Sequence, residues 1–321
     1  MSEPVALGVD LGGTKIYSVA ATAGGRILAD DYRRTEAAGG PQAVVERVVA
    51  SLREALARSG RSMSEVAGAG ISTPGPCDPS KGLVTDAPNL PGFHNVELAE
   101  LVGEALGLPT VLENDANAAC YGEHRFGAGQ GFRHILYVTL GTGIGGGMMI
   151  DGKIYWGASG AAGEVGHIII DQDGPPCNCG SRGCLEALAS GPAIARAAEA
   201  AAAEGRSARL AELAAGGPLS AEQVHRAALQ GDRAAKEVIE RAGEQLGLGL
   251  TGLLNCFNPE ALILGGGLLG MGDLYLGPAL ATARKLAFPQ VVADATIVTA
   301  KLGESAGALG AAALMMGQAH R

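Results

Sequence analysis

Three cysteines and a histidine stand close together in the sequence, as Cys177, Cys179, Cys184 and His167. Three thiolate sulfurs and one imidazole nitrogen make a complete tetrahedral ligand set for structural zinc. Glycines within this C-x-C-x4-C stretch allow the tight loop that such a site needs. The sequence therefore predicts a structural Zn²⁺ ion bound by these residues.

Two other accounts of these residues are weaker. Asp171 and Asp173 are poorer fourth ligands, because zinc with three thiolates takes a nitrogen or another sulfur. A redox pair is the runner-up, although the spacing contains no C-x-x-C. The remaining cysteines, Cys77, Cys120 and Cys256, are expected to be buried, reduced thiols of a cytoplasmic protein.

A second group of chemically active residues forms the stretch DLGGTK near the N-terminus. Gly12 and Gly13 let the backbone fold close to an anion, while Thr14 offers a hydroxyl and Lys15 a cation. Asp10 offers a hard oxygen ligand suited to Mg²⁺. These properties are typical of a phosphate-binding turn.

A related glycine turn, LGTGIGG, contains Gly141, Thr142 and Gly143. Its G-x-G-x-x-G spacing resembles a dinucleotide fingerprint, but that site needs a helix directly after the glycines, and MMIDGKIYW predicts strands. An ordinary glycine hairpin would explain either turn alone. Both turns together, with Asp10 ahead of the first, favour a nucleotide held between two halves of the protein.

Polar residues gather where a buried strand ends and a helix begins, at Glu113, Asn114, Asp115 and Asn117. In α/β proteins the carboxyl ends of strands form ligand clefts. Asp115 is either the N-cap of the helix or a carboxylate that orients and deprotonates a phosphoryl acceptor. The sequence leaves both interpretations open.

The composition limits the classes of protein to which the chain can belong. The net charge of −9 over 321 residues argues against nucleic acid as the main partner. The N-terminus lacks a signal peptide pattern, and the most apolar window is interrupted by polar residues, so no membrane span is predicted. Strands alternate with helices, and the hairpin pattern around residue 12 recurs around residue 143, which predicts a duplicated α/β architecture.

The motifs DLGGTK, ENDAN, LGTGIGGG, GEVGH and CNCGSRGCLE, in this order, resemble the ROK family (repressor, open reading frame, kinase), and are most similar to its bacterial glucokinases. The resemblance covers nearly the whole chain. It implies an actin-like ATPase fold, hexokinase-type and ribonuclease H-like, with two lobes that close on sugar and ATP. It implies a small lobe of residues 1–115 with 303–321, and a large lobe of residues 116–302 that carries the zinc loop and the nucleotide glycine turns.

The resemblance also implies roles for individual residues. Asp115 would be the catalytic base that takes the proton of a sugar 6-hydroxyl. The sugar would be held by Gly75, Asn89, Asn114, Asp115, Glu164, His167 and Glu186. ATP and Mg²⁺ would be bound by Asp10, Gly12, Gly13, Thr14, Lys15, Gly141, Thr142, Gly143, Gly266 and Gly267. The zinc ligands of the family match His167, Cys177, Cys179 and Cys184.

The function that the resemblance implies is ATP-dependent phosphorylation of D-glucose to glucose 6-phosphate, a step of glycolysis. One alternative is a kinase for mannose, fructose, allose or an N-acetylated amino sugar. Another is a sugar-binding regulatory protein without catalysis, against which the intact Asp10, Lys15 and Asp115 count. No DNA-binding domain is expected ahead of DLGGTK. We expect a cytoplasmic homodimer or homotetramer that binds sugar and ATP, and neither nucleic acid nor membranes.

Overall fold

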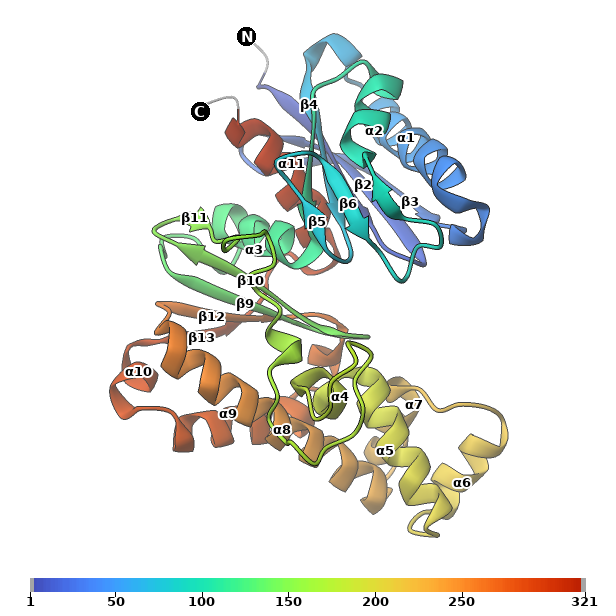
Figure 1. Ribbon diagram of the computed structural model, residues 1–321, viewed down its shortest axis with the longest axis vertical. Coiled ribbons are helices and arrows are strands. Elements are labelled where there is room, and N and C mark those ends of the chain that lie inside the picture. The colour runs from blue at the N-terminus through green and yellow to red at the C-terminus, as the bar shows by residue number, and fades with distance from the viewer. Residues whose placement is uncertain (1–2, 319–321) are drawn as a thin grey trace. The chain divides into compact units, whose positions relative to one another are not determined.

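The computed structural model describes residues 3–318 and divides into two compact units (Figure 1). Unit 1 comprises Met1–Tyr137, Gly147–Gly163 and Ala300–Arg321, and unit 2 comprises Val138–Gly146 and Glu164–Thr299. These bounds differ from the predicted lobes, because residues 116–137, 147–163 and 300–302 belong to unit 1. The lobe boundaries stay a prediction, and residues 1–2 and 319–321 lie outside the described range.

The main sheet of unit 1 has the strand order β3-β2-β1-β4-β8. Its first three strands are antiparallel neighbours, whereas β4 and β8 run parallel to β1. Its strands are β1 (Val5–Leu11), β2 (Lys15–Thr22), β3 (Ile27–Arg34), β4 (Val66–Thr73) and β8 (Thr110–Asn114). The DLGGTK turn therefore connects β1 and β2 as a hairpin, as the sequence predicts.

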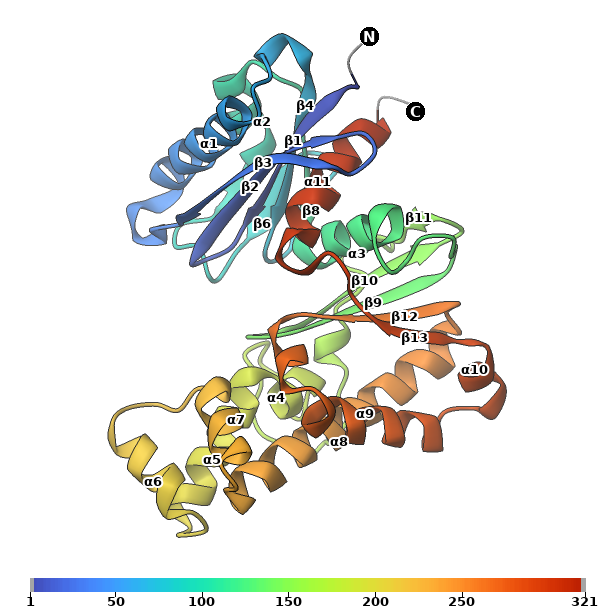
Figure 2. The ribbon, with the colours of Figure 1, turned by 180° about the vertical axis from the view of Figure 1, so that it is seen from behind.

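Helices cover both faces of this sheet (Figure 2). The apolar stripe of α1 (Gly40–Arg58) and that of α2 (Leu98–Leu106) join residues of β1, β4 and β8 in the main core. On the opposite face α11 (Ala306–Gln318) packs against alternate residues of the same strands, and α3 (Asp115–Phe126) packs against α11. Because side chains alternate between the two faces along β1, this strand contributes apolar residues to the layers on both sides of the sheet.

Glycines inside β1 and β4 permit the close approach of α11. A Cβ at Gly8 would lie 1.9 Å from the carbonyl oxygen of Ala308, and a Cβ at Gly70 would lie 1.9 Å from that of Ala311. Glycine in a strand interior marks such a close backbone approach.

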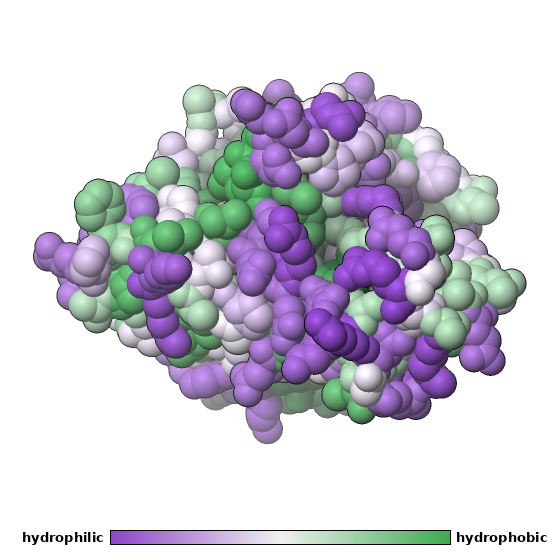
Figure 3. Space-filling model, turned by 90° about the horizontal axis from the view of Figure 1, so that it is seen from below, coloured by the Kyte–Doolittle hydropathy of each residue, from purple (hydrophilic) through white to green (hydrophobic). Residues whose placement is uncertain are grey.

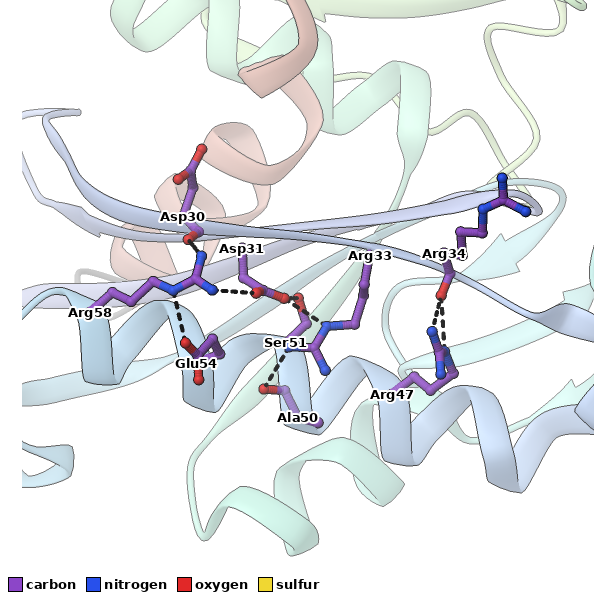
Figure 4. A network of polar contacts seen from close by, with 9 residues as sticks. All are labelled: Asp30, Asp31, Arg33, Arg34, Arg47, Ala50, Ser51, Glu54 and Arg58. Carbon is purple, nitrogen blue, oxygen red and sulfur yellow. Dashed lines mark hydrogen bonds and ion pairs between the residues drawn. The ribbon is translucent and has the colours of Figure 1, made fainter.

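A buried carboxylate fastens α1 to the edge strand β3 (Figure 4). Asp31 Oδ2 accepts hydrogen bonds from Ser51 Oγ at 2.7 Å and Arg33 Nε at 2.6 Å, and Arg58 Nη2 lies 3.4 Å from Oδ1. Burial would raise the pKa of Asp31, but the hydrogen bonds from Arg33 and Ser51, with the charges of Arg33 and Arg58, lower it overall. The ionised Asp31 therefore stabilises the contact between α1 and β3.

A second sheet repeats the order of the first, as β11-β10-β9-β12-β13. Its strands are β9 (Ile135–Leu140), β10 (Ile144–Ile150), β11 (Lys153–Ile154), β12 (Ala261–Gly265) and β13 (Thr296–Thr299). The LGTGIGG turn connects β9 and β10, at the position that DLGGTK holds between β1 and β2. The predicted duplicated architecture is confirmed.

Of this sheet, β11 and parts of β9 and β10 belong to unit 1. Outside the strand residues that it contains, unit 2 is mainly helical. Its helices are α4 (Leu185–Ala189), α5 (Gly191–Ala203), α6 (Ala208–Ala215), α7 (Ala221–Leu229), α8 (Arg233–Phe257), α9 (Asp273–Leu286) and α10 (Pro289–Asp294). Ser220 and Gln223 form a capping box at the start of α7. The buried Tyr275 of α9 donates from its hydroxyl to the carbonyl of Ala189 at 2.7 Å, which joins the end of α4 to α9.

Two features depart from the sequence-based expectations. Unit 1 contains a small sheet of β5 (Cys77–Asp78), β6 (Leu83–Asp86) and β7 (His94–Val96), which the sequence did not indicate. Cys77 and Cys120 are buried, as predicted, but Cys256 is exposed near the end of α8. The prediction of burial for Cys256 is wrong, because this residue stands in the last turn of α8, where residues 255–258 are all exposed.

Within the described residues, no helix is long and apolar enough to cross a membrane. The face of the molecule in Figure 3 mixes hydrophilic and hydrophobic residues, and the hydrophobic ones gather in patches. Such patches are ordinary, since apolar atoms contribute roughly 55–60% of the accessible surface of a folded protein.

Candidate functional site

The carboxylate of Asp115 lies exposed at the start of α3, directly after β8. The N-cap of this helix is Asn114, whose Oδ1 accepts hydrogen bonds from the backbone amides of Ala116 at 3.0 Å and Asn117 at 3.3 Å. The N-cap interpretation of Asp115 is therefore wrong. Asp115 Oδ1 also accepts from the amide of Ala116, at 2.8 Å, so the carboxylate is held by the first turn.

The side chain of Asn114 also reaches a glycine that the sequence placed in the sugar site. Its Nδ2 donates to the carbonyl oxygen of Gly75 at 3.4 Å. Gly75 has a φ of 82°, and a Cβ there would lie 2.4 Å from the carbonyl oxygen of Asp86. Only glycine fits this position, and unit 1 thereby brings Asn114 and Gly75 together.

Asn89 lies against the DLGGTK turn. A Cβ at Gly13 would lie 2.6 Å from the carbonyl oxygen of Asn89 and 2.9 Å from its Cβ. The turn itself is closed by the amide of Gly12, which donates to the carbonyl of Lys15 at 2.8 Å, and by Thr35 Oγ1, which donates to the carbonyl of Gly12 at 2.6 Å. A predicted sugar contact and a predicted phosphate turn are therefore neighbours in unit 1.

Asp10 is held by a residue that the sequence did not single out. Ser72 of β4 is its partner in the strand register, and Ser72 Oγ donates to Asp10 Oδ1 at 2.7 Å. Burial raises the pKa of Asp10, against the hydrogen bond from Ser72 and the charge of Lys15. An oxygen ligand that is costly to ionise without a cation suits a site for Mg²⁺. Lys15 Nζ lies 3.4 Å from Glu304 Oε1 at the surface.

Parallel strands explain why these distant segments meet. The register pairs Asp10 of β1 with Ser72 of β4, and Ser72 with Glu113 of β8. The carboxyl ends of parallel strands lie at one edge of a sheet, where α/β proteins bind ligands. The polar residues of unit 1 therefore share that edge.

The second glycine turn and the Gly266–Gly267 junction come together in unit 2. The amide of Gly141 donates to the carbonyl of Gly143 at 2.9 Å, and the carbonyl of Gly141 accepts from Gly191 at 2.9 Å. A Cβ at Gly266 would lie 2.3 Å from the carbonyl oxygen of Leu140, directly before the turn. Gly267 begins a short 3₁₀ helix, Gly267–Met271. The predicted phosphate turn and the predicted adenosine contacts Gly266 and Gly267 therefore lie close together in unit 2.

The predicted zinc ligands also come together in unit 2. The donor atoms of His167, Cys177, Cys179 and Cys184 all lie within 4.8 Å of one another. Cys177 Sγ lies 3.6 Å from His167 Nδ1, and Cys179 Sγ lies 3.7 Å from Cys184 Sγ. Three sulfurs and one nitrogen at this spacing fit a tetrahedral zinc ion. Among the described residues, neither aspartate of the loop belongs to the group.

Backbone pairing shapes the loop that carries the cysteines. Ile169 bridges to Cys184, Pro176 bridges to Arg182, and the amide of Cys177 donates to the carbonyl of Ser181 at 2.8 Å. Burial and, after it, the neighbouring thiols of Cys177 and Cys179 raise the pKa of the Cys184 thiol to about 12. A bound cation would allow these neighbouring thiols to be deprotonated at the same time.

The imidazole of His167 has two differently placed nitrogens. Nδ1 faces the sulfur of Cys177, whereas Nε2 lies 3.9 Å from Glu164 Oε2. The nitrogen that faces away from the sulfurs therefore lies beside another predicted sugar contact. Among the predicted sugar contacts, Asn89, Asn114 and Asp115 belong to unit 1. The others with ionisable side chains belong to unit 2, and they are Glu164, His167 and Glu186.

Four residues near these sites were missed as site residues from the sequence: Ser72, Glu113, Trp156 and Glu304. Register with Asp10 identifies Ser72 only once the strand order is known. Glu113 had a sequence signal, because it stands in the polar cluster that ends β8. Trp156 and Glu304 reach their partners Glu113 and Lys15 through tertiary structure alone.

The repeated sheets, the two glycine turns and the carboxylate-bearing strand ends define a protein of the actin-like ATPase class. The ROK family matches residues 6–318, and the chain belongs to this family.

Proteins of known function are similar over almost the whole chain. A glucokinase of Thermotoga maritima is 38% identical over 96% of this chain and 96% of its own length. A ROK hexokinase from Thermus thermophilus is 34% identical, with a TM-score of 0.83, over 98% of this chain and 99% of the other. A ROK family glucokinase from Streptomyces griseus, in complex with glucose and AMPPNP, is 37% identical, with a TM-score of 0.82, over 97% and 98%.

Proposed function

We propose that the protein is an ATP-dependent hexose kinase that phosphorylates D-glucose at its 6-hydroxyl. Oxygen 6 of the sugar forms a bond to the γ-phosphorus of ATP while the bond from that phosphorus to the β,γ-bridging oxygen breaks. Asp115 accepts the hydroxyl proton, and ADP leaves with the electron pair of the broken bond. The likeness to the glucokinases of Thermotoga maritima and Streptomyces griseus supports glucose as the substrate.

The observation that carries the proposal is the exposed carboxylate of Asp115 beside a helix cap made by its neighbour. Because Asn114 caps α3, the Asp115 carboxylate can receive a proton without undoing the start of the helix. Asn114, Gly75 and Asn89, on the same edge of unit 1, would orient the sugar hydroxyls. Orientation supplies most of the rate in phosphoryl transfer, and the base adds about 10²–10⁴-fold.

The glycine turns would bind the nucleotide through backbone amides. Gly12, Gly13 and Thr14 follow β1, and Gly141, Thr142 and Gly143 follow β9. Amides at such turns bind phosphate oxygens on an acidic protein as well as on a basic one. Asp10 would bind Mg²⁺, Lys15 would face a phosphate, and Gly266 and Gly267 would lie near the adenosine.

The cysteine and histidine cluster would hold a structural zinc ion. A shell of three sulfurs and one nitrogen is closed, so the ion has no open position for substrate. His167 would bind the ion through Nδ1, which orients the ring so that Nε2, beside Glu164, meets a sugar hydroxyl. Glu186, which follows Cys184 by two positions, would contact the sugar from α4.

A panel of sugars with ATP and with polyphosphate tests the proposal through coupled ADP release and through sugar phosphate formation. We expect the highest kcat/KM for glucose with ATP. A higher value for mannose, fructose, allose or an N-acetylated amino sugar would replace glucose with that sugar. Glucose binding without any turnover would instead favour the regulatory alternative.

Three further expectations stay predictions. Light scattering tests the homodimer or homotetramer, and a nucleic-acid binding assay tests the expected absence of nucleic acid as a partner. Fractionation of the producing cells tests the cytoplasmic location.

A further inference from the structure

Glu113 is a buried carboxylate that none of the proposed sugar or nucleotide contacts includes. It is the last residue but one of β8, and only 3% of its surface is exposed. A buried carboxylate is costly unless hydrogen-bond donors surround it. The donors around Glu113 therefore indicate why the protein keeps a charge at this position.

Glu113 receives hydrogen bonds from two directions. Its Oε1 accepts from the backbone amide of Asn114 at 3.0 Å and from Nδ2 of Asn117 at 3.1 Å. Its Oε2 accepts from Nε1 of Trp156 at 2.8 Å. One oxygen thus serves the junction of β8 and α3, and the other serves a segment more distant in the chain.

The Oε1 side of Glu113 holds the helix start that carries Asp115. Asn114 is the cap of α3, and Asn117 lies in its first turn. Asn117 is buried, and its Oδ1 has no hydrogen-bond partner within residues 3–318. The bond from Nδ2 to Glu113 therefore orients the Asn117 amide, and with it the turn on which Asp115 stands.

The Oε2 side of Glu113 holds the loop that leads to Glu164 and His167. Trp156 is the second residue of a segment without strand or helix, which runs through Gly157, Gly160 and Gly163 at φ values of 70°, 85° and 98°. A backbone with several glycines at positive φ has little rigidity of its own. The half-buried Trp156 side chain, bonded to Glu113, is an anchor of this loop in unit 1.

We propose that Glu113 is a positioning residue that links the start of α3, with Asp115, to the Trp156 loop, which leads to the sugar contacts Glu164 and His167. The inference rests on the proposed function. A carboxylate is required because it accepts from every donor, whereas a glutamine has one accepting oxygen and an NH₂ group that would face a donor. Glutamine therefore cannot satisfy both sides, and repulsion between its NH₂ group and the donor that it faces disturbs the α3 side and the Trp156 side together.

The test compares Glu113→Gln, Trp156→Phe and the double variant by kcat and by KM for glucose. Trp156→Phe keeps the aromatic body but removes the donor, so we expect KM to rise about 10-fold while kcat stays within about 3-fold. Glu113→Gln should raise KM by a similar factor and also lower kcat about 10–100-fold, because small displacements of a base cost rate. The double variant should have a KM no higher than that of Glu113→Gln, since both changes break one link.

Asp31→Asn is the matched control, because Asp31 is also a buried carboxylate but fastens α1 to β3. It should lower Tm without changing kcat or KM. Multiplicative effects of Glu113→Gln and Trp156→Phe on KM would overturn the link. So would a Glu113→Gln variant that loses Tm as Asp31→Asn does and keeps the kinetics of the unmodified protein.

Calorimetric titration with glucose separates this inference from the proposed function. A protein that binds glucose but does not turn over overturns the kinase proposal alone. In that case the positioning role of Glu113 is tested by the affinity of the variants for glucose. Weaker binding in both Glu113→Gln and Trp156→Phe supports the link, and unchanged binding in both overturns it.

Discussion

The Glu186 carboxylate of α4 accepts a hydrogen bond from the backbone amide of Ile144, at 2.9 Å between Oε2 and N. Ile144 begins β10 directly after the Gly141–Thr142–Gly143 turn, and Glu186 follows Cys184 by two positions. One side chain thus connects the segment after the cysteine loop to the predicted phosphate turn within unit 2. The amide of Ile144 is occupied by Glu186, so phosphate would be bound by the turn ahead of it.

Glu186→Ala and Glu186→Gln should separate the two roles of this side chain. Alanine removes the acceptor, so the turn loses support and KM for ATP should rise about 10-fold, as the loss of a charged hydrogen bond predicts. Glutamine keeps a carbonyl for Ile144, so KM for ATP should stay within about 2-fold while KM for glucose rises. Steady-state kinetics with each substrate varied makes the comparison. Equal KM values for ATP in the two variants would contradict the connection.

Asp115→Asn should abolish most turnover and leave glucose binding intact. The amide cannot take the 6-hydroxyl proton, so kcat should fall about 10²–10⁴-fold. Coupled ADP release measures kcat, and calorimetry measures the dissociation constant for glucose. Asp115 is exposed and Asn114 supplies the cap, so the variant should fold. A near-normal kcat would remove Asp115 from the role of base.

The cluster of His167, Cys177, Cys179 and Cys184 should hold one zinc ion per chain, measured by elemental analysis of active protein. Cys179→Ala should lose zinc and raise KM for glucose more than KM for ATP. The reason is that two predicted sugar contacts, His167 and Glu186, flank the cysteine loop in the sequence. Cys256→Ala is the matched control, because Cys256 is an exposed thiol outside the cluster. Active protein that contains no zinc would refute the assignment.

His167→Gln should raise KM for glucose while retaining a polar side chain. Metal on Nδ1 would orient the ring, and a glutamine amide lacks that constraint. The same variant should bind zinc more weakly, which a competition assay with a chelator measures. Tighter zinc binding together with an unchanged KM would contradict the orienting role.

The emission of Trp156 should report the ionisation of Glu113, because Trp156 is the single tryptophan of the sequence. Burial raises the pKa of Glu113 above its ordinary value of 4.5, although hydrogen bonds from Trp156, Asn117 and Asn114 oppose the rise. As pH falls, protonation should change the emission with a midpoint above 4.5. Circular dichroism over the same range controls for acid unfolding.

Glu113→Gln should abolish this emission change. Asp115 and Cys77 are titratable groups close to Glu113, and burial raises the pKa of the Cys77 thiol to about 12, far from this range. Asp115→Asn therefore serves as the control and should keep the transition. An emission change that disappears in Asp115→Asn but persists in Glu113→Gln would contradict the assignment of this change to Glu113.

Much of the fold could be predicted from local patterns. Glycine turns between apolar strands predicted the two hairpins, and the period-3.6 apolar stripe from Val44 to Leu56 is typical of a helix such as α1. The small sheet of β5, β6 and β7 could not be predicted, because its strands are short and carry no alternation that distinguishes them from a loop.

The sequence by itself indicated the cysteines and histidine of the candidate metal site and the carboxylate ahead of α3, because cysteine spacing and the ENDAN stretch are local. Only tertiary structure decided that Asn114 rather than Asp115 caps α3, since capping depends on backbone dihedrals and on which side-chain oxygen reaches the amides. It also decided that Ser72 holds Asp10, that Glu186 holds Ile144 and that Glu113 holds Trp156. These pairs join segments far apart in the chain, and a hydrogen bond of about 3 Å between such segments is set by strand register and packing.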